Sequence, residues 1–334
     1  MNQKIKKIAI VRLSALGDII NSAVVLQFIN KAYPDATIDW ITEEVFAPLL
    51  QNHPLVQNVH TVNLKRLKKK GSFKLLKETI RQLRLLHGYD IVIDMQGLIK
   101  SAMVARLVGK STHGFDKDSS RESLASFFYK TTSHISYQTN VVKRNCFIVG
   151  DASDFEINDA MILNKEAIFP TKQHFGLRSD VKNIALVIGA SWKSKIYPKE
   201  LLAEVCQALN AEFYIVWGTQ EEKEKAEWIT QKSSNTTLAP KLPLNELVSF
   251  IASMDLLIGN DTGPTHIAWA QNIPSITLFG PTNERMIYET PQNIALNSPS
   301  KVNILKIDKN DFSIKDIPVK EIVNKAKELL KHGI

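Results

Sequence analysis

The sequence predicts an α/β protein in which two doubly wound parallel sheets form successive domains. Seven short apolar runs alternate with amphipathic stretches, three in the first half and four in the second: KIAIVRL, TIDWIT, YDIVIDMQG, NIALVIGAS, EFYIVWG, DLLIGND and PSITLFG. Runs of this length are typical of parallel strands whose two faces are covered by helices. With 334 residues and 44% hydrophobic content, the chain is long enough for two such cores.

The domain boundary is expected near residue 170, because residues 150–180 are polar and lack a clear period. We therefore expect a Rossmann-like domain over 1–170 and another over 171–315. The last stretch, 316–334, predicts an amphipathic helix, which we expect to pack back on the N-terminal domain. Two such domains would face each other across a cleft at the carboxyl ends of their strands.

Composition and spacing exclude several classes of protein. The apolar run before Arg12 is too short for a signal peptide, and no run approaches the roughly 20 residues of a membrane-spanning helix. Cys146 and Cys206 show no CxxC spacing, so we expect neither a disulfide framework nor a structural zinc site, and we expect a cytoplasmic protein. No GxGxxG follows any run, which counts against an NAD-dependent oxidoreductase.

The net charge of +8 is concentrated in the first half of the chain. Five cations lie within residues 65–70, and four more follow at a spacing that places them on one helical face: Lys74, Lys77, Arg81 and Arg84. Such a group either is a solvated surface or meets an anionic sugar, phosphate or membrane surface. Nucleic acid is not expected, because no aromatic residues alternate with the cations.

Three turns in the second half carry the candidate donor-binding residues. In GNDTGPTHIAWA, Asp261, Thr262 and Gly263 begin a helix whose free amides suit a diphosphate; helix capping is the alternative for the first two, and core packing for His266. In GASWKSKIYPKE, small residues including Ser191 precede Lys195, which could neutralise a phosphate or be a solvated lysine. Glu222 could bind ribose hydroxyls or compensate a helix dipole.

In the first half, Asp18 of RLSALGDII follows the first apolar run where a phosphate-binding glycine loop would be expected. Taken alone, it is either a helix cap or a catalytic carboxylate. Gln96, Arg121 and Arg144 are further polar candidates in this half, and the two arginines extend its basic character. Each of the three, taken alone, could have a structural role.

Taken in order, these stretches resemble the lipopolysaccharide heptosyltransferases of glycosyltransferase family 9, which are inverting enzymes with the two-domain GT-B fold. The shared elements are S-x-x-GD, D-x-QGL-x-KSA, RE-x-LAS-x-FY, the lysine before an aromatic-Pro pair, WG, DTG-x-x-H and GPT, and they span nearly the whole chain. QGL and RESLAS are more similar to the type I enzymes, which add the first heptose to the inner Kdo (3-deoxy-octulosonic acid) of lipid A, than to the type II enzymes.

The resemblance implies a role for each candidate. Asp18 would be the general base, Lys195 would contact the diphosphate of the donor ADP-heptose, and Glu222 the ribose. The other donor contacts would be Ser191, Asp261, Thr262, Gly263 and His266. The acceptor, Kdo2-lipid A, would meet Lys65, Arg66, Lys68, Lys69, Gln96, Arg121 and Arg144. Two departures from the family pattern are present. Ala190 and Ser191 stand where some members have a pair of threonines, and Asn140 replaces a histidine.

The resemblance also implies that the protein holds no metal or other resident cofactor. Its expected place is the cytoplasmic face of the inner membrane, in peripheral contact with the anionic inner leaflet. The alternatives are a type II activity on a heptosylated core, or a non-catalytic protein that binds a nucleotide sugar or a membrane surface. A need for Asp18 in turnover separates the enzyme from the binding protein.

Overall fold

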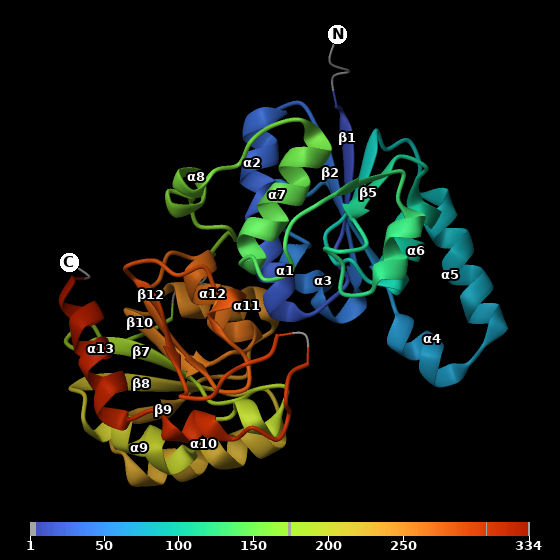
Figure 1. The fold of residues 1–334 in the computed structure, drawn as a ribbon. Helices are drawn as coiled ribbons and strands as arrows, with labels where there is room; N and C mark the ends of the chain where they lie inside the picture. Colours follow the sequence, from blue (N-terminus) through green and yellow to red (C-terminus); the bar gives the residue numbers. More distant parts are fainter. Residues whose placement is uncertain (1–4, 173–174, 305, 333–334) are drawn as a thin grey trace. The chain divides into compact units, whose positions relative to one another are not determined.

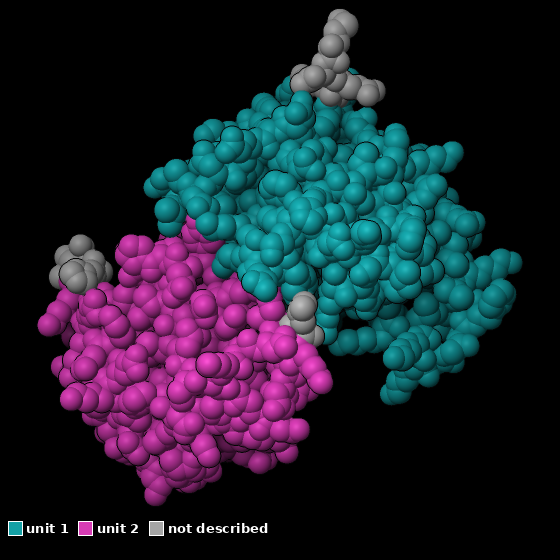
Figure 2. Space-filling model, viewed as in Figure 1, with its two compact units in different colours: residues 1–170 teal, residues 171–334 magenta. Residues whose placement is uncertain are grey.

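A computed structural model describes residues 5–172, 175–304 and 306–332. The chain forms two compact units, residues 1–170 and 171–334, which divide where the sequence analysis places the domain boundary (Figures 1 and 2). Each unit is built around one parallel sheet.

The sheet of unit 1 has six parallel strands in the order β3-β2-β1-β4-β5-β6. This is the order of a Rossmann fold, in which the chain builds outward from β1 in one direction and then from β4 in the other. The strands are β1 (Lys7–Val11), β2 (Thr37–Glu43), β3 (Asn58–Val62), β4 (Ile91–Asp94), β5 (Thr112–Phe115) and β6 (Thr131–Ser133).

Helices cover both faces of this sheet. The helices α1, α2 and α7 pack together on one face, and α5 and α6 pack together on the other (Figure 1). The helices of unit 1 are α1 (Leu16–Ala23), α2 (Val25–Ala32), α3 (Ala47–Leu50), α4 (Leu64–Lys70), α5 (Phe73–Leu85), α6 (Ile99–Val108), α7 (Val141–Ser153) and α8 (Asp159–Leu163), with the 3-10 turns η1 (Glu44–Phe46) and η2 (Ser123–Phe128).

Unit 2 repeats the architecture with the strand order β12-β11-β10-β7-β8-β9, again all parallel. Counted from its own first strand, this is the same order as in unit 1. The strands are β7 (Lys182–Val187), β8 (Ala211–Val216), β9 (Thr236–Leu238), β10 (Leu256–Asn260), β11 (Ser275–Phe279) and β12 (Asn293–Asn297).

In unit 2, α9 packs against α10 and α13, and α11 packs against α12. The helices are α9 (Lys199–Gln207), α10 (Gln220–Lys232), α11 (Leu244–Ala252), α12 (Gly263–Ala270) and α13 (Val319–His332), with the 3-10 turns η3 (Lys193–Lys195), η4 (Glu284–Met286) and η5 (Ser313–Asp316). None of the helices among the described residues has both the length and the apolar content needed to cross a membrane.

The C-terminal helix corrects one expectation. Ile322, Ala326 and Leu329 of α13 are buried in the core of unit 2, where the helix packs against α9, β10 and β11. It is therefore part of the second unit, and the expected packing on the N-terminal domain is wrong. The amphipathic pattern shows that a buried face exists, but it does not identify the core that the face covers. Residues 333 and 334 lie outside the described residues.

The seven predicted strands are all present, and five more complete the sheets. The additional strands are β3, β5, β6, β9 and β12. Four of them lie at or beside a sheet edge and are partly exposed, so their residues need not be continuously apolar. The fifth additional strand, β5, has the sequence THGF, which includes a glycine and a histidine. Pairing with the neighbouring strands, and not its own sequence, makes it a strand.

A buried carboxylate holds the β2 side of the first sheet. Asp39 on β2 is 1% exposed and accepts hydrogen bonds from Asn58 at 2.9 Å and from Tyr89 at 2.6 Å, with His60 Nε2 at 3.2 Å. Burial alone would raise the pKa of Asp39, but the hydrogen bonds and the nearby imidazole lower it to about 2. Asp39 therefore favours the folded state as a carboxylate.

We expect Asp39→Asn to reduce the acid sensitivity of folding. Because the folded pKa lies below the unfolded value near 3.9, the contribution is complete above about pH 4 and is lost as pH falls toward 2. The variant should lose about 2 kcal/mol of unfolding free energy at pH 7 and much less at pH 2. Urea unfolding across this range measures the difference. Glu156→Gln, at an exposed carboxylate of the same unit, is the control, and an unchanged slope in Asp39→Asn would contradict the assignment.

Candidate active site

Several of the candidate residues lie where the strand order reverses in each sheet. In unit 1 this point lies between β1 and β4, and in unit 2 between β7 and β10. Loops that follow these strand pairs diverge to opposite faces, which leaves a crevice at the carboxyl ends where open α/β sheets bind ligands. Asp18 and Gln96 follow β1 and β4, whereas Lys195 and Asp261 follow β7 and β10. Each unit therefore presents one set of polar side chains.

Asp18 is held by two donors in the loop after β1. Its Oδ1 lies 2.8 Å from Arg12 Nη2, and its Oδ2 accepts the N–H of Ala15 at 3.1 Å. Asp18 is the third residue of α1, and Ala15 occupies the N-cap position. Because Asp18 accepts the N–H of Ala15, it also helps to cap the start of α1, so the helix-capping alternative is present in the structure. The Asp18 side chain is 26% exposed, so the carboxylate is fixed in orientation and open to solvent.

Arg12 was not among the predicted site residues, although it directly follows the run IAIV. It is 7% exposed, and its Nη1 also donates to the carbonyl of Met95 in the loop after β4. The guanidinium therefore connects the two loops at the reversal point and orients Asp18. The sequence signal was a cation at the first position after a buried strand.

Gln96 and Lys100 lie beside the loop that carries Asp18. Gln96 Oε1 accepts the N–H of Leu13 at 2.8 Å, and its Nε2 donates to Ser14 Oγ at 3.3 Å. Lys100 Nζ lies 3.5 Å from the same hydroxyl, and its side chain is exposed. The predicted acceptor residue Gln96 is thus largely used to join the loops, and Lys100 places a cation at this edge.

The buried carboxylate of Asp94 holds the backbone of Gln96. Asp94 is fully buried and accepts hydrogen bonds from Tyr129 Oη at 2.7 Å and from the N–H of Gln96 at 2.8 Å. Burial raises the pKa of Asp94 more than these hydrogen bonds lower it, and burial beside Asp94 raises the pKa of Tyr129. Gly97 follows with a φ of +67°, a backbone conformation that residues with a side chain rarely adopt.

The cluster of cations at residues 65–70 lies on a helix. Lys65, Arg66, Lys68 and Lys69 belong to α4, which is capped at its start by Asn63 and ended by Gly71 in the left-handed conformation. All four cations are exposed. Lys65 and Lys100 both act on Glu43 at the end of β2, whose pKa is raised by burial and partly lowered by these two ammonium groups. The basic helix therefore begins at the carboxyl edge of the sheet.

Arg144 was predicted to bind the acceptor, but it has a structural role. It is 5% exposed and donates to the carbonyls of Ser119 and Ser136 at 2.7 Å and of Ile135 at 2.9 Å. Its guanidinium also lies over the Phe115 ring at 4.4 Å. A buried arginine with its donors directed at carbonyls fixes the loops after β5 and β6. Arg121, in contrast, is exposed.

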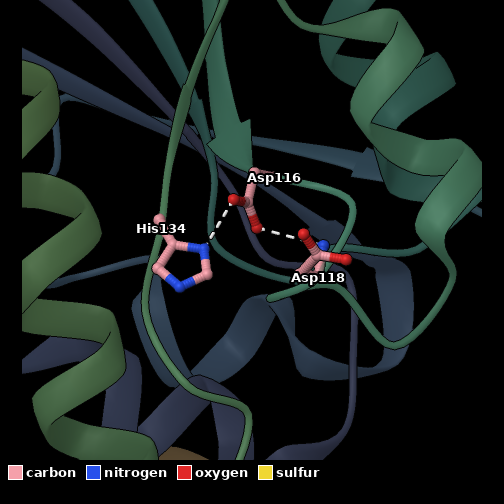
Figure 3. Close-up of side chains that lie close together, drawn as sticks. All are labelled: Asp116, Asp118 and His134. Carbon is pink, nitrogen blue, oxygen red and sulfur yellow. Dashed lines mark hydrogen bonds and ion pairs between the residues drawn. The ribbon is translucent and has the colours of Figure 1, made fainter.

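Figure 3 shows Asp116, Asp118 and His134 close together after β5 and β6. Asp116 accepts the N–H groups of Asp118 at 3.1 Å and of Ser119 at 2.8 Å, and its other oxygen lies 2.7 Å from His134 Nδ1. Burial opposes ionisation of Asp116, but these partners lower its pKa. Asp118 and His134 are exposed. The contacts explain the cluster as a loop closure, and we assign no ligand to it.

In unit 2, Asp261 is the centre of a buried polar group. It is 3% exposed, and its Oδ2 lies 2.5 Å from Lys195 Nζ and accepts the Thr282 hydroxyl at 2.7 Å. Its Oδ1 lies 3.4 Å from His266 Nε2. Burial alone would raise the pKa of Asp261, but Lys195 and His266 hold it well below the usual range. Asp261 is thus a buried carboxylate that positions Lys195.

The start of α12 is left without a side-chain cap. Thr262 occupies the capping position but makes no side-chain hydrogen bond to the first turn, and Asp261 is engaged by Lys195 and Thr282. The capping alternative for these two residues is therefore not supported. Gly263 begins the helix, and its amide stands at the positive end of the helix dipole.

Asn260 joins the two loops of unit 2, a role that sequence reasoning missed. Its side-chain amide donates to the carbonyl of Ile188 at 3.0 Å and accepts the N–H of Tyr197 at 3.0 Å. Tyr197 directly follows the turn that carries Lys195, so Asn260 sets the position of that turn. The signal was present in GND, where Asn260 precedes Asp261.

The positions of Glu222 and Ser191 do not separate a donor-binding role from a structural one. Glu222 Oε2 accepts the N–H groups of Gly218 at 2.7 Å and Thr219 at 3.1 Å, which together with the Thr219 hydroxyl forms a capping box for α10. Its Oε1 packs where a Cβ on Gly189 would lie 2.1 Å away. The helix-start alternative is therefore present in the structure. Ser191 is exposed.

Comparison with known proteins agrees with these features. The profile of glycosyltransferase family 9 (heptosyltransferase) matches residues 77–311. Lipopolysaccharide heptosyltransferase 1 of Campylobacter coli is 39% identical over 97% of this chain and 98% of its own length. Its namesake from Pseudomonas aeruginosa is 29% identical over 83% of this chain and 79% of its own length.

A solved structure shows the same fold. The E. coli heptosyltransferase WaaC with ADP-2-deoxy-2-fluoro heptose superposes with a TM-score of 0.79 at 24% identity, over 96% of this chain and 99% of that chain. The predicted GT-B fold class is confirmed by this likeness and by the two parallel sheets. With most of its length matched by the family profile, the chain is a glycosyltransferase and belongs to glycosyltransferase family 9, the heptosyltransferases.

Proposed function

We propose that this protein transfers L-glycero-D-manno-heptose from ADP-heptose to the inner Kdo of Kdo2-lipid A, with inversion at the anomeric carbon. The observation that carries the proposal is the fixed, solvent-open carboxylate of Asp18 at the reversal point of the first sheet. An inverting transfer needs a base for the acceptor hydroxyl and a separate stabiliser for the leaving diphosphate.

The acceptor hydroxyl oxygen attacks the anomeric carbon of heptose, and its proton passes to Asp18. The bond from that carbon to the diphosphate oxygen breaks, and ADP leaves with the electron pair. Arg12 keeps the Asp18 carboxylate oriented for this transfer, because it binds one oxygen at 2.8 Å and leaves the side chain partly exposed. The donor supplies the reacting group, and the proposed step uses no resident cofactor.

Unit 2 supplies the features that suit the leaving group. Lys195 is held by Asp261 and directed by Asn260 through the turn before Tyr197. The uncapped amides at Gly263 add a positive helix end. We propose that these groups bind the diphosphate and that His266 contacts the donor sugar or its phosphates. Glu222 is proposed to keep one oxygen for the ribose while the other caps α10.

The acceptor is proposed to bind through its negative charges. Kdo carries a carboxylate and lipid A carries phosphates, and Lys65, Arg66, Lys68 and Lys69 offer exposed cations beginning at the carboxyl edge of the first sheet. Arg121 adds another exposed cation. Because lipid A lies in a membrane, the protein would work peripherally at the cytoplasmic face of the inner membrane. The relatives named for type I activity support this acceptor.

We expect Asp18→Asn to lower kcat for heptose transfer by about 100- to 10,000-fold, because the neutral amide cannot take the proton. The Kd for ADP should change little, since donor binding is assigned to unit 2. Single-turnover transfer to Kdo2-lipid A and calorimetry with ADP measure the two effects. Asp118→Asn, at an exposed carboxylate of the same unit, is the matched control. Normal turnover in Asp18→Asn would remove this residue from the mechanism.

We expect Lys195→Ala to weaken ADP binding by about 10- to 100-fold, because a charge-assisted contact to the diphosphate is lost. Lys193→Ala is the control, since Lys193 is exposed in the same turn. Titration calorimetry on both variants gives the comparison. An equal loss in the two variants would mean that general positive charge, and not the positioned ammonium, binds ADP.

Neutralising Lys65, Arg66, Lys68 and Lys69 to Gln should raise KM for Kdo2-lipid A by at least about tenfold. KM for ADP-heptose should stay within about twofold of the value for the unchanged protein, because the donor is assigned to unit 2 and does not contact these cations. Initial rates with each substrate varied in turn provide the test. Equal changes in both KM values would show that α4 is only a solvated surface.

The acceptor itself is decided by assaying the purified protein with ADP-heptose and either Kdo2-lipid A or its heptosylated product. Transfer to the first substrate alone supports the proposal. Transfer only to the heptosylated core would indicate a type II activity. Binding of ADP-heptose without transfer to either would indicate a non-catalytic nucleotide-sugar binding protein.

A further inference from the structure

The net charge of the chain is located in one helical segment. Residues 64–85, which form α4 and α5, contain nine Lys and Arg residues and a single carboxylate, Glu78. The segment has a formal charge of +8, which equals that of the entire chain, so the remaining residues are neutral in sum. A charge concentrated in this way points to one anionic partner surface.

Most of these cations form no ion pair with the residues that the structure describes. Among the residues that the structure describes, Arg81 has the only ion pair recorded for the segment, with Glu78 at 3.2 Å. The four cations of α5 are all exposed: Lys74, Lys77, Arg81 and Arg84. Like charges on one helix face repel each other, so this arrangement is stabilised when an anionic surface lies against it.

A large aromatic side chain lies between the two groups of cations. Phe73 is 78% exposed and is the first residue of α5, directly after the turn that Gly71 and Ser72 form at the end of α4. Leu85, at the other end of α5, is 65% exposed. At 100° per residue, Phe73, Lys77 and Arg84 share one line of the helix, and Lys74, Arg81 and Leu85 lie beside it.

The opposite side of α5 is accounted for by the fold. Leu83 is 4% exposed and belongs to the core, and α5 packs against α6 (Figure 1). The neighbouring α6 has a similar outer face, with the exposed residues Lys100, Met103 and Arg106 at helical spacing. The two helices therefore present a cationic surface that contains separate apolar side chains and no exposed carboxylate on α6.

We propose that the outer face of α5, with Phe73 at its start, binds the surface of an anionic lipid bilayer and holds the protein there independently of the acceptor. The inference deepens the proposed peripheral location by naming the surface. Long cationic side chains place their charge among lipid headgroups while an aromatic ring enters the interface. The cations of α4, at the carboxyl edge of the sheet, remain available to the acceptor.

The test uses the full-length protein and vesicles that contain no lipid A. Sedimentation with phosphatidylcholine vesicles, with and without 30% phosphatidylglycerol, measures lipid binding apart from acceptor binding. We expect binding only to the anionic vesicles, with affinity falling between about 0.1 and 0.5 M salt. Changing Lys74, Lys77, Arg81 and Arg84 to Gln should weaken it more than about 100-fold. Phe73→Ser should weaken it by about 5- to 20-fold.

Two matched controls separate this surface from general effects. Changing Lys315, Lys320, Lys327 and Lys331 to Gln removes the same charge from exposed positions of unit 2. Phe147→Ser removes an aromatic ring that is 42% exposed on α7, at the opposite face of the first sheet. Both controls should bind the anionic vesicles within about threefold of the unchanged protein. Circular dichroism confirms that each variant is folded.

The outcomes distinguish this inference from the proposed reaction. Heptose transfer to a detergent-solubilised acceptor should be unchanged in Phe73→Ser and in the four-residue α5 variant. If the unchanged protein binds neutral and anionic vesicles equally, or if the control variants lose binding as the α5 variants do, the surface is wrong even where transfer proceeds. If Phe73→Ser raises KM for the solubilised acceptor, α5 belongs to the acceptor site instead.

Discussion

Each sheet reverses its strand order once, and this topological constraint determines where the polar side chains can gather. The loops after β1 and β4, and those after β7 and β10, diverge from a shared edge, so residues far apart in the chain come together there. Arg12 joins the first pair of loops through the Met95 carbonyl, and Asn260 joins the second pair through Ile188 and Tyr197. These hydrogen bonds fix the loops to each other, so that each unit has one defined group of polar side chains at the point of strand reversal.

Each unit contains an ion pair between an aspartate and a cation, and the two pairs differ in how exposed the carboxylate is. In unit 1, Arg12 is buried while the side chain of Asp18 is 26% exposed, so the carboxylate is the open partner. In unit 2, Asp261 is 3% exposed and has contacts on both oxygens, so it serves to hold Lys195. A buried carboxylate with three partners remains ionised but has little freedom to exchange a proton. This difference in exposure supports the proposal that Asp18 is the base and that Lys195 binds the phosphate.

The net charge of the chain lies in a different segment from the residues proposed for proton transfer and phosphate binding. Residues 64–85 carry the net charge, whereas Arg12 and Lys195 are each paired with a carboxylate. Attraction of an anionic surface acts over roughly a Debye length, and proton transfer requires contact within hydrogen-bond distance. Under the proposed function, α5 would locate the protein at the membrane, α4 would bind the acceptor, and the loops after the strands would carry the reaction.

The sequence by itself determined the α/β class, the boundary near residue 170 and the strand ends that carry Asp18, Lys195 and Asp261, because local apolar runs and the residues after them are properties of short segments. Only the tertiary structure decided how distant side chains are used. It showed that Arg144 is buried against carbonyls, that α13 belongs to unit 2, and that five further strands complete the sheets. Burial, partners and sheet edges depend on contacts between segments, and no local pattern contains them.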